Sequence, residues 1–163
     1  MENKRVALFK KIWEAQDVAY DLMAEYDSLP HRYGENTLYQ AEAHLIDLIA
    51  LHPDITITAL ANILHKTPSA CSQIMRKLRD KGWVEQLRNQ KNNREFMLRL
   101  TDAGQQVYQD HAAFDHYCQE LTFRKLEGIS DEELEIYLRV QSKLNEAYAD
   151  DVSRSKEYFG RQE

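Results

Sequence analysis

Apolar residues recur at helical spacing over several long stretches of this chain. In residues 6–26 and 37–51 they repeat every three or four positions, with charged residues between them. The second stretch ends before Pro53, because proline disfavours helical geometry in the preceding residue. The intervening residues 27–36 (DSLPHRYGEN) are rich in turn formers, and we expect a loop there.

Two shorter helices and a hairpin are predicted next. The pattern indicates helices over residues 56–65 and 67–81, the latter capped by Thr67, with Pro68 tolerated in its first turn. Apolar and polar residues then alternate in residues 83–87 and 95–100 around the polar run RNQKNN, which is typical of a β-hairpin.

The last third of the chain predicts two more helices. One spans residues 101–125, and the next begins at a capping box, Ser130 to Glu133. We expect the final ten residues, which are polar, to fray. With only five Gly and three Pro, the chain is predicted to be a mainly α (α+β) protein with long helices.

Charge is distributed unevenly along the chain. Residues 55–100 hold nine Lys and Arg against three acids, whereas the whole chain has a net charge of −6. A basic segment inside an acidic protein is typical of a surface that binds a polyanion. The amino terminus is charged, without the apolar core of a secretory leader, and no apolar run is long enough to span a membrane. We therefore expect a cytoplasmic protein without a membrane partner.

The predicted helix 67–81 has an apolar side and a polar side. Cys71, Met75 and Leu78 share the apolar side, which we expect to face the core. The other side could be an ordinary solvated surface, but the basic hairpin that follows favours DNA binding, with the helix in a major groove. The candidate DNA-binding residues are Thr67, Pro68, Ser69, Ser72, Gln73, Arg76, Lys77, Arg88, Lys91 and Arg94.

Residues 55–104 resemble the MarR family of winged-helix transcriptional regulators. The resemblance lies in K-G-W-V-E, from Lys81, and in L-x-L-T-x-x-G, from Leu98. Two features depart from the family pattern. Asn89 and Asn92 stand where the wing usually has acidic residues, and His65 stands where the turn between the paired helices usually has Gly.

The resemblance implies a winged helix-turn-helix and a homodimer on a pseudo-palindromic operator. It divides the chain into a DNA-binding lobe, residues 37–104, and a helical dimerisation region, residues 1–36 and 105–163. The apolar faces of residues 6–26 and 134–152 have no other expected partner in a small winged-helix lobe, which is consistent with pairing. The dimerisation candidates are Phe9, Trp13, Leu138, Leu144 and Tyr148.

Members of the family commonly release DNA when a ligand binds. Resemblance to the zinc-sensing branch makes Glu25, His44, His111 and Asp115 effector or metal candidates, with Asp115 in place of a histidine. No cofactor is required, zinc is one candidate effector, and an aromatic small molecule is another. An ordinary polar helix surface is the alternative. A thiol switch is disfavoured, because Cys71 faces the core and Cys118 lacks a clear activating partner.

The leading interpretation is a sequence-specific transcriptional regulator, a repressor by expectation, that binds double-stranded DNA. The alternative is a winged-helix module that binds protein and not DNA. An enzyme is disfavoured, because the sequence has no glycine-rich phosphate loop, nucleophile elbow or HExxH motif.

Overall fold

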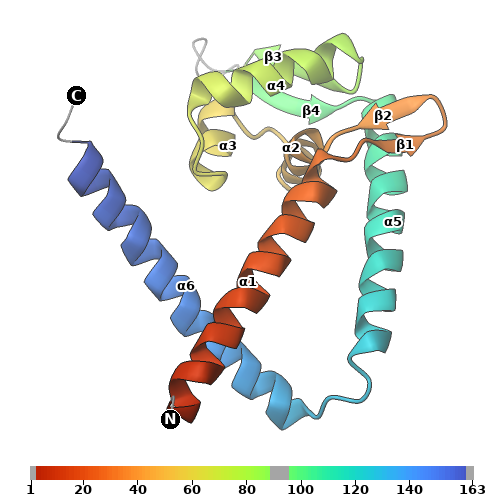
Figure 1. Ribbon diagram of the computed structural model, residues 1–163. Coiled ribbons are helices and arrows are strands. Elements are labelled where there is room, and N and C mark those ends of the chain that lie inside the picture. The colour runs from red at the N-terminus through yellow and green to blue at the C-terminus, as the bar shows by residue number, and fades with distance from the viewer. Residues whose placement is uncertain (1–2, 89–95, 161–163) are drawn as a thin grey trace. The chain divides into compact units, whose positions relative to one another are not determined.

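In a computed structural model, which describes residues 3–88 and 96–160, the chain is mainly helical, as the sequence predicts. Figure 1 shows the order of the elements. Their bounds are α1 Lys4–Ser28, β1 His31–Tyr33, β2 Asn36–Leu38, α2 Gln40–Leu51, α3 Ile57–Ile63, α4 Pro68–Asp80, β3 Val84–Arg88, β4 Phe96–Leu100, α5 Asp102–Lys125 and α6 Asp131–Phe159. Two compact units, residues 1–115 and 116–163, divide the chain within α5.

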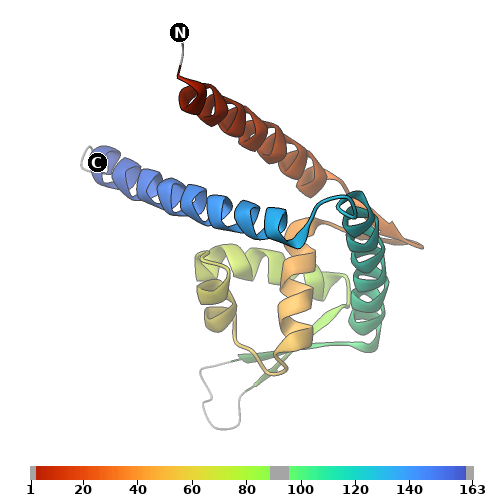
Figure 2. The same cartoon turned by 90° about the horizontal axis from the view of Figure 1, so that it is seen from below.

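The first unit contains a winged-helix lobe. Helices α2, α3 and α4 pack with the antiparallel β3–β4 hairpin around one core, which Figure 2 shows from below. The hairpin register pairs Val84 with Leu100 and Gln86 with Leu98. A bridge between Thr56 and Met97 adds a short third segment to this sheet. The largest fully buried apolar side chains of the lobe are those of Leu38, Leu45, Ile46, Ile49, Leu60, Met75, Leu78 and Leu98.

The segment predicted as a loop is a small hairpin, so this prediction was wrong. Strands β1 and β2 pair His31 with Leu38, and Gly34 takes the positive φ of 60° that the turn between them requires. Leu38 is fully buried and thereby joins the hairpin to the core, so α2 begins at Gln40 and not at residue 37. Strands of three residues are too short to show an alternating pattern in the sequence.

The end of α6 also differs from expectation. The predicted capping box is present: the Ser130 Oγ accepts from the Glu133 N–H at 3.3 Å, and the Glu133 carboxylate accepts from the Ser130 N–H at 2.9 Å. The helix continues to Phe159, however, through residues that we expected to fray. Local bonds such as that from the Ser153 Oγ to the Ala149 carbonyl at 3.0 Å are consistent with this extension.

Helices α1 and α6 contain no buried residue among those described. On α1 the Phe9 side chain is 54% exposed and Trp13 42%, and on α6 Leu138 is 65% exposed, whereas Leu144 and Tyr148 are half-buried. Neither helix is apolar enough to cross a membrane, nor is any other helix in residues 3–88 and 96–160.

An ion pair connects the turn after α2 to the wing. Arg99 on β4 donates to both carboxylate oxygens of Asp54, at 2.6 and 3.2 Å. Asp54 has a positive φ of 69°, a conformation that Asp and Asn adopt more readily than most residues. The hydrogen bond from Arg99 holds the pKa of the Asp54 carboxyl below its usual value.

Gly104 generates the first testable prediction. A Cβ at this position would lie 1.9 Å from the Trp83 carbonyl oxygen, a backbone atom that cannot move away cheaply. We expect Gly104→Ala to lower the free energy of unfolding by about 1–3 kcal/mol, measured by urea denaturation. Gly128→Ala is the matched control, because no atom lies within 4 Å of its added Cβ. Equal stability of the two variants would contradict the predicted clash.

The second testable prediction concerns the ion pair between Asp54 and Arg99. A carboxyl whose pKa is lower in the folded state stabilises that state above its unfolded pKa of about 4. This contribution is lost as the pH falls through the lowered pKa of Asp54. Asp54→Asn keeps a side chain suited to the positive φ but removes the charge. We expect wild type to be the more stable at pH 6, and the difference to shrink below about pH 4. A difference that stays constant with pH would exclude this ion pair as its source.

Candidate nucleic-acid interface

The start of α4 is fixed by its capping residue. The Thr67 Oγ1 accepts a hydrogen bond from the Ala70 N–H at 3.2 Å, and Pro68 is the first helical residue. Pro68 lacks an N–H at a place where a helix has no internal acceptor for one. The predicted start of this helix is therefore confirmed.

Two faces of α4 have opposite environments, as predicted. Cys71, Met75 and Leu78 are at most 1% exposed and belong to the inner face. Burial raises the pKa of the Cys71 thiol, which makes this cysteine a poor redox sensor. The outer face presents exposed residues from successive turns of the helix: Ser69, Gln73, Arg76 and Lys77.

The remaining predicted DNA-binding residues have mixed environments. Thr67 and Pro68 are exposed at the start of α4, and Arg88 is exposed at the end of β3. Ser72 is half-buried, and its hydroxyl donates to the Pro68 carbonyl at 2.8 Å, so it is left to act as an acceptor. The predicted wing residues Lys91 and Arg94 lie outside the described residues, as do Asn89 and Asn92.

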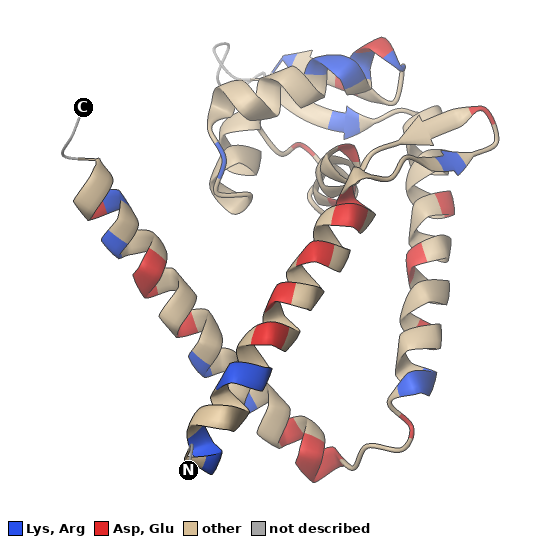
Figure 3. Ribbon diagram, viewed as in Figure 1, with Lys and Arg blue, Asp and Glu red and all other residues tan. Residues whose placement is uncertain are grey.

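Several basic residues of the segment 55–100 donate hydrogen bonds to other side chains of the protein. Arg79 donates to Gln86 on β3, and Arg99 donates to Asp54. Figure 3 shows the Lys and Arg positions on α4 and the acidic positions spaced along α1. Charge counting alone does not distinguish engaged cations from available ones, and on α4 the exposed Arg76 and Lys77 are the best placed to meet phosphates or bases.

His65 occupies the turn between α3 and α4 with a positive φ of 50°. This left-handed conformation is the one for which glycine is best suited. His65 therefore adopts the left-handed conformation that would suit the glycine usual at this position. The His65 side chain is exposed, so it meets no steric obstacle from the core.

A partly buried ion pair at the other end of α4 was not predicted from the sequence. Lys81, which follows the last helical residue, donates to the carboxylate of Glu42 on α2. Glu42 is the third residue of α2 and also accepts from the Tyr39 N–H at 3.0 Å. A Glu three residues after a helix cap is a known capping signal. That signal predicts the hydrogen bond from the Tyr39 N–H to Glu42, but it does not predict the ion pair between Glu42 and Lys81.

A second polar cluster contains three of the four effector candidates. The His111 side chain, 1% exposed on α5, shares a hydrogen bond of 2.8 Å between its Nδ1 and the Tyr33 hydroxyl. Its Nε2 lies 3.4 Å from the Asp115 carboxylate. Burial raises the pKa of Asp47 on α2, a residue the sequence analysis missed. His111 and His44 are near enough to Asp47 to oppose that shift.

This cluster does not fit a zinc ion as it is arranged. In residues 3–88 and 96–160, no three His, Cys, Asp or Glu side chains converge closely enough to hold a metal. His44 instead interacts with Gln40, at 3.3 Å between their side-chain nitrogens. Two buried atoms, the Gln40 Oε1 and the His111 Nε2, have no hydrogen-bond partner among the described residues. The described contacts do not connect Glu25 to this cluster.

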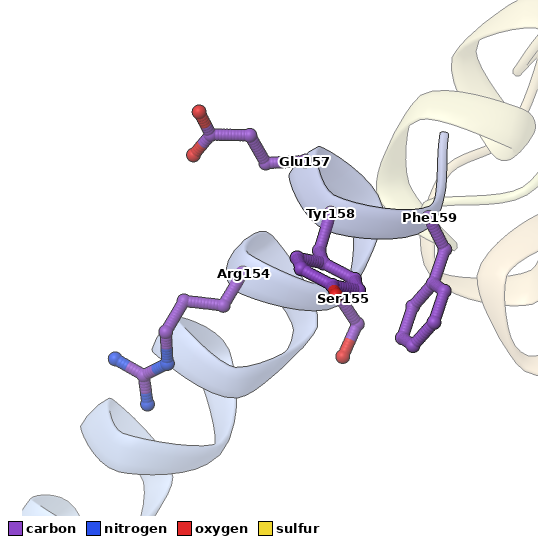
Figure 4. Close-up of a pocket in the computed structure, with 5 residues that line it drawn as sticks. All are labelled: Arg154, Ser155, Glu157, Tyr158 and Phe159. Carbon is purple, nitrogen blue, oxygen red and sulfur yellow. The ribbon is translucent and has the colours of Figure 1, made fainter. Parts of the chain in front are cut away.

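A surface hollow at the end of α6 was not predicted from the sequence. Figure 4 shows its lining, in which Tyr158 and Phe159 lie beside each other with ring centroids 4.9 Å apart. Its lining residues within the described part of the chain all come from α6: Arg154, Ser155, Glu157, Tyr158 and Phe159. A hollow lined by one helix is shallow and gives no support to a catalytic site.

Comparison with known proteins supports the winged-helix interpretation. A curated relative, the "Uncharacterized HTH-type transcriptional regulator YhjH" of Bacillus subtilis (strain 168), is 24% identical over 123 residues, covering 75% of this chain and 70% of the relative. FabT of Streptococcus pneumoniae, solved in complex with DNA, is similar with a TM-score of 0.69 at 23% identity, over 87% of this chain and 98% of that chain.

A second solved structure is ZitR of Lactococcus lactis, described as a zinc-responsive MarR family member. It has a TM-score of 0.71 at 19% identity, over 86% of this chain and 99% of that chain. A sequence model of the MarR family matches residues 38–96, which run from the end of β2 to the start of β4. Residues 38–96 therefore match the MarR family model, and the chain has a fold similar to those of the solved FabT and ZitR structures.

Proposed function

We propose that this protein is a sequence-specific transcriptional regulator that binds duplex DNA through α4. The observation that carries the proposal is the outer face of α4, where Gln73, Arg76 and Lys77 are exposed on a helix anchored by its buried face. Arg can donate two hydrogen bonds to guanine, and Gln can pair in the same way with adenine. FabT, which has a similar fold, is solved with DNA. The proposal includes no catalytic step.

The regulator acts as a homodimer, and its operator is a pseudo-palindrome. Support comes from the exposed apolar side chains of α1 and α6, such as Phe9 and Leu138, which are unfavourable in water. A two-fold dimer presents two copies of α4, which places the half-sites about one DNA turn apart. Repression, by blocking a promoter, is the simplest consequence of such binding. The alternative is a module that binds protein and not DNA. Salt-dependent binding to duplex DNA would favour the regulator over this alternative.

A ligand also releases the regulator from DNA. The candidate site for this ligand is the cluster around His111. Two buried atoms without a hydrogen-bond partner among the described residues, the Gln40 Oε1 and the His111 Nε2, suit a ligand with hydrogen-bonding groups, and the Nε2 also lies 3.4 Å from the Asp115 carboxylate. Because the candidate metal-binding side chains do not converge in the described residues, the proposed release does not require a metal ion. Zinc chloride titrated into the protein–DNA complex tests this directly. A zinc-induced release that His111→Gln abolishes would require a metal site after all.

The third prediction concerns Arg76. Operator duplexes are first selected from a random-sequence library with the wild-type protein. We expect Arg76→Ala to weaken binding to the selected operator about tenfold or more, because a forked contact to a base contributes about 1–3 kcal/mol of discrimination. The measurement is fluorescence anisotropy at fixed salt, with the dimer checked by sedimentation.

Arg124→Ala is the matched control, because it removes the same charge from α5, outside the DNA-binding lobe. We expect this variant to bind the operator as wild type does. Operator affinity that survives Arg76→Ala would show that α4 does not read the bases through this residue. A wild-type protein that selects no duplex at low salt would contradict the proposed function itself.

A further inference from the structure

The carboxylate of Glu42 and the ammonium of Lys81 connect the end of the recognition helix α4 to α2. We propose that this pair is a positioning device, which sets the orientation in which α4 presents its outer face to DNA. The inference rests on the proposed function and names two residues outside the candidate DNA-contact surface.

Lys81 uses its full donor capacity inside the protein. Its Nζ donates to both oxygens of Glu42, at 2.8 and 2.7 Å, and to the Thr37 carbonyl on β2 at 2.9 Å. An ammonium group has three N–H donors, so three acceptors satisfy it. The end of α4 is thereby bonded to two elements that precede it in the chain, α2 and the β1–β2 hairpin.

Among the residues that the structure describes, Glu42 has no alternative partner of equal strength. Its side chain is 5% exposed, and its other hydrogen bond comes from the Tyr39 N–H at 3.0 Å. A buried carboxylate is costly unless it is paired and hydrogen-bonded. Removing the ammonium would therefore leave a largely buried carboxylate without its ionic partner, and movement of α2 or α4 would relieve that cost.

Trp83 restricts where the ammonium can lie. The Lys81 Nζ is 4.5 Å from the centroid of the Trp83 ring, and Trp83 is 4% exposed. A cation over an indole face is attracted to it. The tightly packed Gly104 on α5 contacts the Trp83 backbone. The position of Lys81 is therefore determined by a rigid aromatic ring as well as by its acceptors.

The same geometry argues against a phosphate-binding role for Lys81. A lysine that binds DNA backbone keeps its donors free for phosphate oxygens, whereas all three donors of Lys81 have protein acceptors. Base recognition depends on side chains held within a fraction of an ångström of their targets. Arg76 lies little more than one helical turn before Lys81, so a shift at this end would displace it.

The test compares four variants on the selected operator and on an unrelated duplex, each over a range of salt concentrations. Lys81→Met and Glu42→Gln each remove one partner of the ion pair. The double variant removes both partners, so no unpaired charge is left behind. Lys77→Met removes one exposed charge from the same helix and is the control. Urea denaturation confirms that each variant is folded under the assay conditions. Should Lys81→Met fail to fold, Glu42→Gln, which retains an acceptor for the Tyr39 N–H, carries the test.

For a positioning pair, we expect both single variants to reduce the ratio of operator to unrelated-duplex affinity about tenfold, the size of one lost base contact. The double variant should be no worse than either single variant, and the salt dependence of binding to unrelated DNA should stay unchanged. Lys77→Met should lower the slope of log affinity against log salt concentration by about one. It should also weaken binding to the operator and to the unrelated duplex by similar factors.

Two results would overturn the inference while leaving the proposed function intact. One is an unchanged affinity ratio in folded Lys81→Met and Glu42→Gln, which would make the pair purely structural. The other is a salt slope that falls for Lys81→Met with unchanged binding for Glu42→Gln, which would make Lys81 a phosphate contact. Failure of the wild type to prefer any duplex would instead reject the proposed function.

Discussion

Burial of one stripe on α4 is the constraint on which the DNA-binding interpretation depends. Cys71, Met75 and Leu78 are withdrawn almost completely from water, and each fully buried apolar side chain contributes about 1.5–3 kcal/mol. Turning α4 about its axis would expose this stripe and bury Arg76 and Gln73 without partners. The outward direction of the polar side chains is therefore a consequence of core packing, and it holds whether or not DNA is present.

Helix α2 connects two polar sites that are far apart in the sequence. Its Glu42 pairs with Lys81 after α4, while its His44 and Asp47 lie near His111 of α5. The residues interspersed among these polar ones on α2 are Ala43, Leu45 and Ile46, and all three are fully buried. Both polar sites thus share one rigid helix, which is fixed along its length by the core of the lobe.

Most of the fold could be predicted from the sequence because its signals are local. The Thr67 cap, the Ser130 capping box and the alternating residues of β3 and β4 each lie within a few positions of the structure they determine. The short β1–β2 hairpin and the end of α6 were missed although they are local, but the ion pairs that escaped prediction join residues distant in the chain: Glu42 and Lys81 are 39 residues apart, and Asp54 and Arg99 are 45 apart. The basic character of residues 55–100 was apparent, but which cations were already engaged was not.

The terminal helices carry a consequence for how the protein behaves on dilution. Most of the stability of a helix in a protein comes from packing of its amphipathic face, and no described residue of α1 or α6 is buried within one chain. In the proposed homodimer, association would then contribute much of the free energy that keeps these helices folded. For such a protein the melting temperature follows mass action and rises with protein concentration. The amount of protein in the cell would then govern the integrity of its long helices as well as the occupancy of its operator.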